Sequence, residues 1–334
     1  MTGGSASSGA AGRLAARLAA RLTARLTAVA RRALRAVQST AARAAFGLVA
    51  VGLAGWAIAS RRELVVDALL RMQGRWLLVA ALATLANLVL TWMAWRAVLA
   101  DLGSRLPFRP AARIFFVGQI GKYVPGSLWP VVVQAELGRD HGVARRRSAS
   151  ATLVLILLSA FSALLVVMAT LPFVPAVAEN GFGWTLLLVV PLVVLLHPKV
   201  LGRLLDRLLR LVGRPPLGEW TSLRGTAVAL GWALASWTGA GLQVFCLAIS
   251  MGAPRTWHTL VIAVGGYALA WAVGLVVVVA PAGAGAREVA LAALLSQVLD
   301  SGAVVVVVLL SRVLFTGADL ALAGLGLTVG KPRD

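Results

Sequence analysis

A polar, helix-breaking motif interrupts a hydrophobic stretch of this chain. It runs Gln-Ile-Gly-Lys-Tyr-Val-Pro-Gly-Ser-Leu-Trp over residues 119–129, with apolar residues at 114–117 and 131–133 on either side. Acyl chains cannot satisfy the backbone N–H and C=O groups that such a break frees, so a break at membrane depth must be buried in protein or line a polar cavity. In transporters the half-helix ends at such breaks bind the substrate. The motif therefore predicts a site for a polar or charged group inside a membrane.

A second break, Ala-Pro-Ala-Gly-Ala-Gly-Ala-Arg-Glu over residues 280–288, resembles the first. Each break follows an apolar run, stops the helix with Pro and Gly, and precedes a carboxylate, Glu136 or Glu288. Interrupted segments at corresponding places in two halves of a chain point to a substrate site between repeats. The pattern is compatible with an inverted repeat. The alternative is two ordinary kinks, because Gly and Pro are frequent in membrane helices.

Two basic residues lie within or beside these apolar stretches. Arg312 is inside the run 304–327, and Asp319 follows it two turns later. A charge at the centre of a spanning helix costs about 2.5–3.5 kcal/mol, so we expect Arg312 to pair with Glu288 or Asp319 and to face a cavity. Its guanidinium could hold a lipid phosphate through two parallel hydrogen bonds; an internal ion pair without a ligand is the alternative. Lys122 either binds a headgroup or extends its amine to the membrane interface.

The candidate headgroup-binding set combines the charges with the two breaks. It comprises Lys122, Tyr123, Pro125, Gly126, Trp129, Gly283, Gly285, Glu288 and Arg312. Because lipid satisfies no freed backbone group, we predict that residues 125–129 and 281–288 lie close together around one polar cavity that Arg312 also faces. Trp129 should lie at the cavity mouth or at headgroup level.

Composition requires an integral membrane protein. Of the 334 residues 60% are hydrophobic and 13% charged, with a mean hydropathy of +0.88, whereas soluble domains average roughly 45–50% apolar and 25% charged residues. We predict an all-α polytopic fold with about seven spanning helices plus one or two re-entrant or broken helices, in a single transmembrane domain over residues 44–330. The expected spans are residues 44–60, 76–95, 148–171, 184–196, 226–250, 260–280 and 303–327.

The net charge of +20 is concentrated in a basic leader, residues 1–43, and in short loops beside the spans. This distribution excludes nucleic acid as the expected partner and predicts contact with an anionic inner leaflet, a plasma-membrane location and a cytoplasmic N-terminus. Arginines four residues apart predict that the leader is either an amphipathic helix or partly disordered. Residues 200–212 should form an interfacial amphipathic helix. If residues 281–300 form a re-entrant hairpin, the C-terminus should lie outside; if they cross, it should lie inside.

Signals for an enzyme or a cofactor are missing from the sequence. His141, His197 and His258 lie far apart, and no HExxH, GxSxG or P-loop motif is present. We therefore expect no catalytic residues, no metal site and no cofactor. The single cysteine, Cys246, lies in an apolar run and is predicted to be a small core residue.

Four blocks of the chain resemble the transmembrane, flippase-like domain of the lysylphosphatidylglycerol synthase family. They are residues 121–129, residues 138–143 (Gly-Arg-Asp-His-Gly-Val), residues 281–288, similar to the family's Pro-Gly-Gly-x-Gly-x-x-Glu, and Ser311-Arg312. The resemblance covers about residues 76–327. It implies a polytopic inner-membrane protein that binds and flips a lipid, either an aminoacylated phospholipid or a polyprenyl-linked glycan carrier. We expect the translocating part alone, without the soluble aminoacyl-transfer domain.

Two functions follow from these observations. The first is a lipid-binding, flippase-like translocase of an anionic or polyprenyl-linked lipid. The alternative is a non-transporting membrane partner of a glycosyltransferase or lipid-modifying enzyme, which would dock on basic residues within 139–147 and 199–214.

Overall fold

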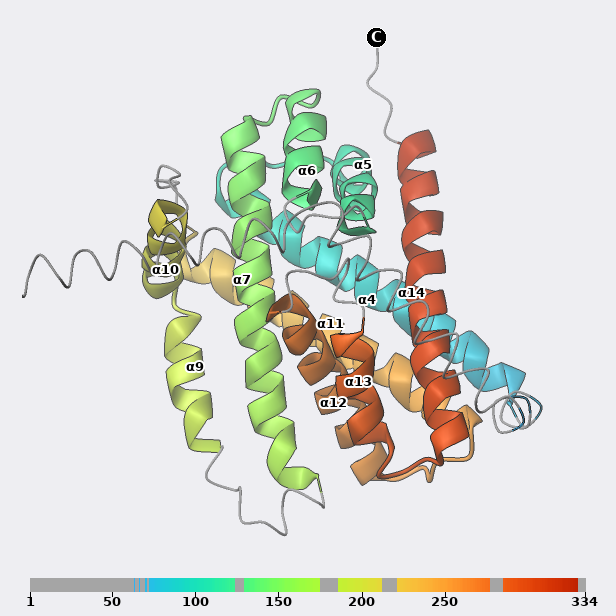
Figure 1. The fold of residues 1–334 in the computed structure, drawn as a ribbon. Helices are drawn as coiled ribbons and strands as arrows, with labels where there is room; N and C mark the ends of the chain where they lie inside the picture. Colours follow the sequence, from blue (N-terminus) through green and yellow to red (C-terminus); the bar gives the residue numbers. More distant parts are fainter. Residues whose placement is uncertain are drawn as a thin grey trace, which may run out of the picture.

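The computed structural model describes residues 63, 66, 70, 72–123, 129–174, 186–211, 221–276 and 285–329. Every regular element in these ranges is a helix (Figure 1), which confirms the predicted all-α class. The leader, the expected span at 44–60 and the Pro-Gly centres of both breaks lie outside the described residues.

The first half contains two long helices joined by a short helical pair. α4 (Gly74–Asp101) ends at Gly103, whose φ of 88° favours glycine. α5 (Phe108–Gln119) then runs inward and continues as the single turn η1 (Ile120–Tyr123). After the break, α6 (Trp129–Arg139) returns to the same end of the bundle, where α7 (Arg145–Thr170) begins. The α5–α6 pair is therefore a re-entrant hairpin.

A short connecting unit follows. The turn η2 (Leu171–Phe173) ends α7, and α9 (Val189–Leu195) bends by 76° into α10 (Pro198–Leu211). Leu201 and Leu205 of α10 are buried, whereas its three arginines, Arg203, Arg207 and Arg210, are exposed. The predicted amphipathic helix at 200–212 is confirmed.

The second half repeats the pattern of the first. α11 (Leu223–Ser250) begins at the capping residue Ser222, whose hydroxyl accepts a hydrogen bond from the Gly225 amide at 3.0 Å. α12 (Trp257–Val276) runs inward, and α13 (Ala286–Leu295) returns to the end from which α12 started. α14 (Ser301–Val329) then crosses the whole bundle.

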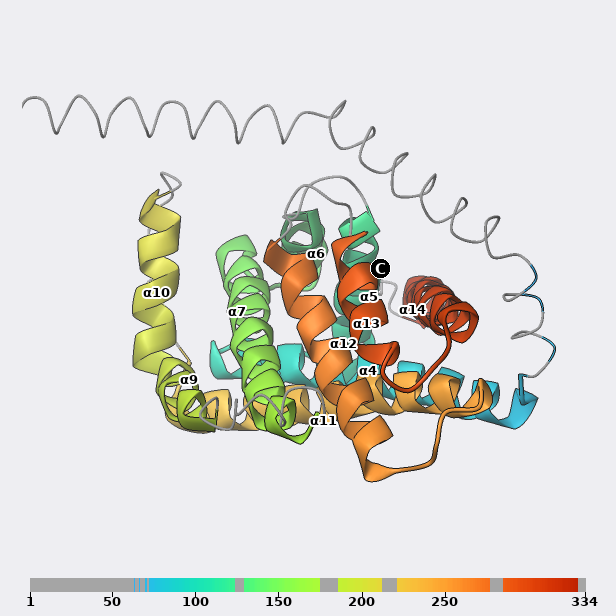
Figure 2. The ribbon, with the colours of Figure 1, turned by 60° about the horizontal axis from the view of Figure 1, so that its bottom comes forward.

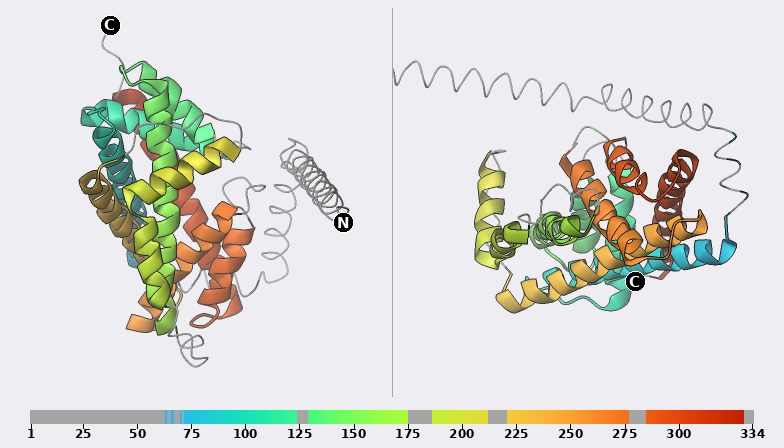
Figure 3. Two further views of the ribbon diagram at one scale, coloured as in Figure 1. Left: turned by 90° about the vertical axis from the view of Figure 1, so that its left-hand side faces the viewer. Right: turned by 90° about the horizontal axis from the view of Figure 1, so that it is seen from below.

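These two halves are related by an inverted repeat. α4 and α11 lie side by side and antiparallel, with Asp101 at the end of α4 accepting from the Ser222 amide at 2.5 Å at the start of α11 (Figure 2). α5 packs on α14, and α12 correspondingly packs on α7. The two hairpins enter from opposite ends of the bundle (Figure 3, left). The repeat suggested by the paired breaks is therefore present.

Five helices of the described residues are long and apolar enough to cross a membrane, and the bent α9–α10 pair could count as a sixth. The chain is therefore a multi-pass membrane protein, and the predicted number of about seven is roughly consistent with this count. The expected span at 184–196 is the α9 part of the bent pair.

The second hairpin begins earlier than the sequence indicates. Its inward arm is α12 itself, so the returning arm α13 brings the chain back to the end at which α12 started. α14 then ends beside α5, where Arg113 donates to the Leu327 carbonyl at 3.0 Å. Both alternatives for the C-terminus assumed that residues 260–280 cross the membrane. α12 is long and apolar enough to span, and it packs on α13 as one arm of a hairpin, so the end of α14 lies on the side of the basic loop at 139–147.

Candidate functional site

Gly121 closes the first break. A Cβ atom at this position would lie 2.8 Å from the Pro130 nitrogen and 2.9 Å from the Trp129 carbonyl carbon. Only glycine permits this approach of η1 to the first turn of α6, because any other residue would push the two backbones apart. The tight contact fixes the direction in which the next two residues, Lys122 and Tyr123, leave the turn.

Both of these residues contact Asp319 of α14. The Lys122 amine lies 2.5 Å from Asp319 Oδ2, and the Tyr123 hydroxyl donates to the same oxygen at 2.7 Å. Asp319 is 2% exposed, and the Tyr123 hydroxyl also lies 3.4 Å from the Thr316 hydroxyl. A buried carboxylate is costly unless it is paired and hydrogen-bonded. The first break therefore supplies a cation and a hydroxyl donor that both contact the Asp319 carboxylate within the protein.

The second break is organised by Glu288. Gly285 begins α13 with a φ of 89°, a conformation that favours glycine. Glu288 Oε2 accepts from the Gly285 amide at 2.6 Å, as a glutamate does at the third position of a helix. Its other oxygen, Oε1, accepts from the Arg312 guanidinium of α14. One carboxylate thus fixes the start of α13 and joins it to α14.

Arg287, which the sequence analysis did not select, completes the group. Its guanidinium carbon lies 4.6 Å from the ring centre of Tyr267 on α12 and 6.0 Å from that of Phe315 on α14. The two rings stack on each other with centres 5.3 Å apart. A cation over an aromatic face is attracted by the electrons of the ring. The position of Arg287 inside the second break was the available signal, but aromatic residues within apolar helices indicated only core packing.

The structure brings most of the predicted residues to one stretch of α14. Lys122 and Tyr123 contact it at residues 316–319, and Glu288, with Gly285 behind it, contacts it at Arg312. The described flanks of the two breaks therefore meet on the same helix, whereas most of residues 125–129 and 281–288, which were predicted to lie close together around one cavity, fall outside the described residues. The remaining candidates are placed differently: Trp129 begins α6 with 44% of its surface exposed, and Pro125, Gly126 and Gly283 lie outside the described residues.

Asp319 differs from its expected role. It lies two turns from Arg312 on the same helix, which suggested the pair Arg312–Asp319. In the structure Arg312 pairs with Glu288, as the other expectation had it, and Asp319 pairs with Lys122. The reason is that each hairpin contributes a partner at its own level of α14. Since an unpaired charge at the bilayer centre costs about 2.5–3.5 kcal/mol, these pairs make the polar segment of α14 tolerable in a membrane.

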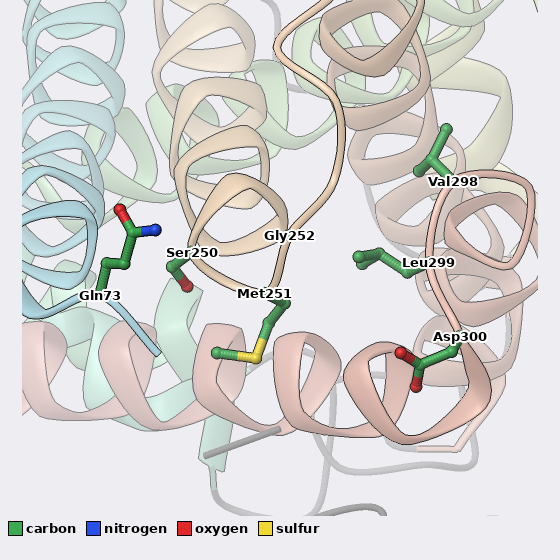
Figure 4. A pocket seen from close by; sticks show the side chains of 7 residues that line it. All are labelled: Gln73, Ser250, Met251, Gly252, Val298, Leu299 and Asp300. Carbon is green, nitrogen blue, oxygen red and sulfur yellow. The ribbon is translucent and has the colours of Figure 1, made fainter. Parts of the chain in front are cut away.

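A separate pocket lies at the opposite end of the bundle from the basic loop. Its volume is about 420 Å³, and it is bordered by the residue before α4, the end of α11 and the segment before α14 (Figure 4). The lining residues are Gln73, Ser250, Met251, Gly252, Val298, Leu299 and Asp300. Asp300 Oδ1 accepts the amides of Gly302 and Ala303 at 2.9 Å each, so the only charge of this lining caps α14. The charged residues of the breaks do not line this pocket.

Comparison with known proteins identifies a family whose match covers most of the chain. Residues 41–323 match the family described as "Lysylphosphatidylglycerol synthase TM region". No curated protein matches the chain. The matched segment contains both hairpins, α14 as far as Ala323, and every residue of the charged group described above.

Proposed function

Because the chain belongs to the lysylphosphatidylglycerol synthase transmembrane-region family, we propose that it binds an anionic or polyprenyl-linked lipid by its headgroup and moves that headgroup across the membrane. The observation that carries the proposal is the meeting of two re-entrant hairpins, from opposite ends of the bundle, on one charged stretch of α14. No bond-breaking step is assigned to the chain.

Such a site offers what a headgroup needs to cross the membrane. A charged headgroup cannot enter the acyl-chain region alone, because desolvation of an isolated ion is far too costly. Lys122 lies against α14 at Asp319 and Arg312 belongs to α14, and each cation is paired with a carboxylate that an anion could replace. Because the hairpins open toward opposite ends, either leaflet could deliver the headgroup. We therefore propose that Lys122, Tyr123, Trp129, Gly285, Glu288 and Arg312 form the lining of the path.

Lipid movement in proteoliposomes tests this proposal. The purified chain is reconstituted with phosphatidylglycerol labelled on an acyl chain by a fluorophore that dithionite bleaches. Dithionite reaches only the outer leaflet, so continued bleaching reports lipid that has moved outward. Lys122→Ala and Arg312→Ala should each slow this movement by about tenfold or more, because a hydrogen bond to a charged group contributes about 1.5–3 kcal/mol.

The matched control is Arg224→Ala, which removes an exposed arginine from the start of α11. It should leave the rate unchanged. If Lys122→Ala and Arg312→Ala fold and move lipid as fast as the unaltered chain, the assignment of the path to these residues is wrong.

We further propose that the basic side of the bundle faces the cytoplasmic leaflet of the plasma membrane, with the N-terminus on that side. Exposed arginines gather there at the α6–α7 turn, at Arg139, Arg145 and Arg146, and each basic residue near an anionic surface contributes about 1 kcal/mol of attraction. The same residues could instead dock a glycosyltransferase or lipid-modifying enzyme. Two results together would replace the transport proposal by that alternative. The first is that no lipid moves in proteoliposomes, and the second is that membranes lacking the chain lose a glycosyltransferase or lipid-modifying activity.

A further inference from the structure

Arg287 is the cation of the candidate site that no carboxylate neutralises among the described residues. Glu288 is occupied by Arg312 and by its own helix start, and Asp319 is occupied by Lys122 and Tyr123. Arg287 instead rests against the rings of Tyr267 and Phe315. Residues 124–128 and 277–284, which lie between the described flanks of the breaks, contain no Asp, Glu, Lys or Arg. The group thus holds three cations against two carboxylates.

These charges act on one another. Arg287 and Arg312 both lie within electrostatic range of Lys122, as does Asp319. Arg287 is only partly buried, so it is accessible from outside the packed core. Aromatic rings attract a guanidinium, but they offer none of the paired oxygen acceptors that its fork of N–H donors matches. Phosphate oxygens provide that geometry. The rings therefore hold the Arg287 guanidinium in place but do not supply the paired oxygen acceptors that its shape matches.

We propose that Arg287 is the primary contact for the phosphate of the transported headgroup and that the site selects a headgroup with net negative charge. This inference rests on the proposed function and specifies its substrate class. One surplus cation matches the single charge of a phosphodiester. A headgroup that adds an ammonium group, whether choline or an aminoacyl amine, would bring a further cation to a site whose two carboxylates are already committed. Repulsion from Arg287 and its neighbours should exclude it.

Ligand-dependent stabilisation of the purified full chain in detergent tests the inference without requiring transport. The unfolding midpoint is followed against dioctanoyl phosphatidylglycerol, dioctanoyl phosphatidylcholine and inorganic phosphate, because a ligand that binds only the folded chain raises the midpoint. Phosphatidylglycerol should bind with a dissociation constant at least about tenfold lower than that of phosphatidylcholine. Arg287→Gln should raise this constant about tenfold or more, and Arg287→Lys, which keeps the charge and loses the fork, should fall between.

Arg255→Gln is the matched control, because Arg255 also lies over a ring, 5.0 Å from the centre of Trp76, but is exposed and outside the charged group. It should bind phosphatidylglycerol like the unaltered chain. Stabilisation by inorganic phosphate that also depends on Arg287 would support the anion site and identify free phosphate as its ligand. Equal binding of the two lipids by the unaltered chain would overturn the inference even if the Arg287 variants do not fold. Binding by Arg287→Gln as tight as by the unaltered chain would also overturn it.

Failure of this inference is distinguishable from failure of the proposed function. Lipid movement that is indifferent to Arg287→Gln would leave the transport proposal intact and remove Arg287 from it. Binding of phosphatidylglycerol that depends on Arg287, without any lipid movement, would support the anion site in a chain that does not transport.

Discussion

Asp319 carries the most buried charge of the candidate site, since its side chain is 1% exposed and that of its partner Lys122 is 32% exposed. Two donors, one from Lys122 and one from Tyr123, converge on the same carboxylate oxygen. A single charged residue of α14 therefore contacts both polar side chains at the inner end of the first hairpin. An unpaired lysine could recover part of its hydration through its exposed third, whereas an unpaired Asp319 could not.

We predict that Asp319→Asn lowers the free energy of unfolding by about 3 kcal/mol, because removing one member of a buried pair leaves the other uncompensated. Unfolding in detergent by heat or by titration with a denaturing detergent measures the loss. Asp140→Asn removes an exposed carboxylate that lies 3.6 Å from Arg139, and it should change stability by less than about 0.5 kcal/mol. Equal stability of the two variants would contradict the account. The double variant Lys122→Met with Asp319→Asn should regain part of the loss.

The sequence predicts which residues need a polar partner better than it predicts which residues pair with each other. A charge inside an apolar run must be paired, so Arg312 was predicted to pair with Glu288 or Asp319, and its partner in the structure is Glu288. The partner of Asp319 was not predicted, because the sequence does not reveal at which level of α14 each hairpin docks. Arg287 was missed for a related reason: Tyr267 and Phe315 resemble ordinary core residues until the fold places a cation over them. Cys246 required no pairing, and it is buried as predicted, at 3% exposure.

At the scale of the element, Gly121 allows the close approach between the two arms of the first hairpin. Gly121→Ala would place a methyl group within 3 Å of the backbone of α6, so we expect a loss of about 1–3 kcal/mol as in other overpacked sites. Lipid movement should fall as well, since Lys122 would be displaced. The same unfolding measurement and the dithionite assay detect the two effects.

Gly231→Ala is the control for that substitution. Gly231 lies within α11, and a Cβ atom there would contact nothing within 4 Å. The change should be neutral or should stabilise by up to about 1 kcal/mol, because alanine is the better helix former. If Gly121→Ala is as stable as Gly231→Ala, the close approach in the first break does not exist in the membrane.

Helix breaks were easier to predict than helix orientation. Pro and Gly mark where a helix must stop, and the described helices end and begin again on either side of the two predicted breaks. Whether an apolar helix crosses the bundle or turns back depends on what packs around its inner end. α12 is long and apolar enough to cross, yet its partner α13 returns to the same end. That is why the sequence left the direction of α14 open.

At the scale of the whole molecule, the inverted repeat fixes which ends share a side of the membrane. The start of α14 lies with the pocket at Gln73 and Asp300, and its end lies with α5 and the basic α6–α7 turn. By the bias of basic residues toward the cytoplasm, the end of α14 should be cytoplasmic and its start should face outward.

Cysteine labelling at the two ends of α14 tests this orientation. Ser301 and Thr328 are both exposed. In a Cys246→Ala background, Ser301→Cys should react with a membrane-impermeant maleimide on intact cells, and Thr328→Cys should react only after the membrane is opened. Reaction of both positions from the outside would contradict the crossing of α14, and the reverse pattern would contradict the orientation.

The paired breaks are what made the repeat visible in the sequence, because the helices of the two halves share few residues that a reader could align. α14 carries Arg312 and Asp319, whereas α7, its counterpart in the repeat, has no charged residue from Ser148 to Thr170. The architecture is thus symmetric and its charge is not. The hydrophobic runs and breaks of the sequence predict the symmetric arrangement of the helices. Only the packed structure shows that the charged groups of both hairpins gather on one helix.

The most direct test of the account is a structure of the chain in lipid nanodiscs that contain phosphatidylglycerol. We predict headgroup density between the hairpins, with a phosphate within hydrogen-bond distance of Arg287 and beside Lys122 and Arg312. Anionic lipid bound only around the outside of the bundle, with the Lys122–Asp319 and Arg312–Glu288 pairs intact and no lipid between them, would contradict the claim that these charges bind the transported headgroup.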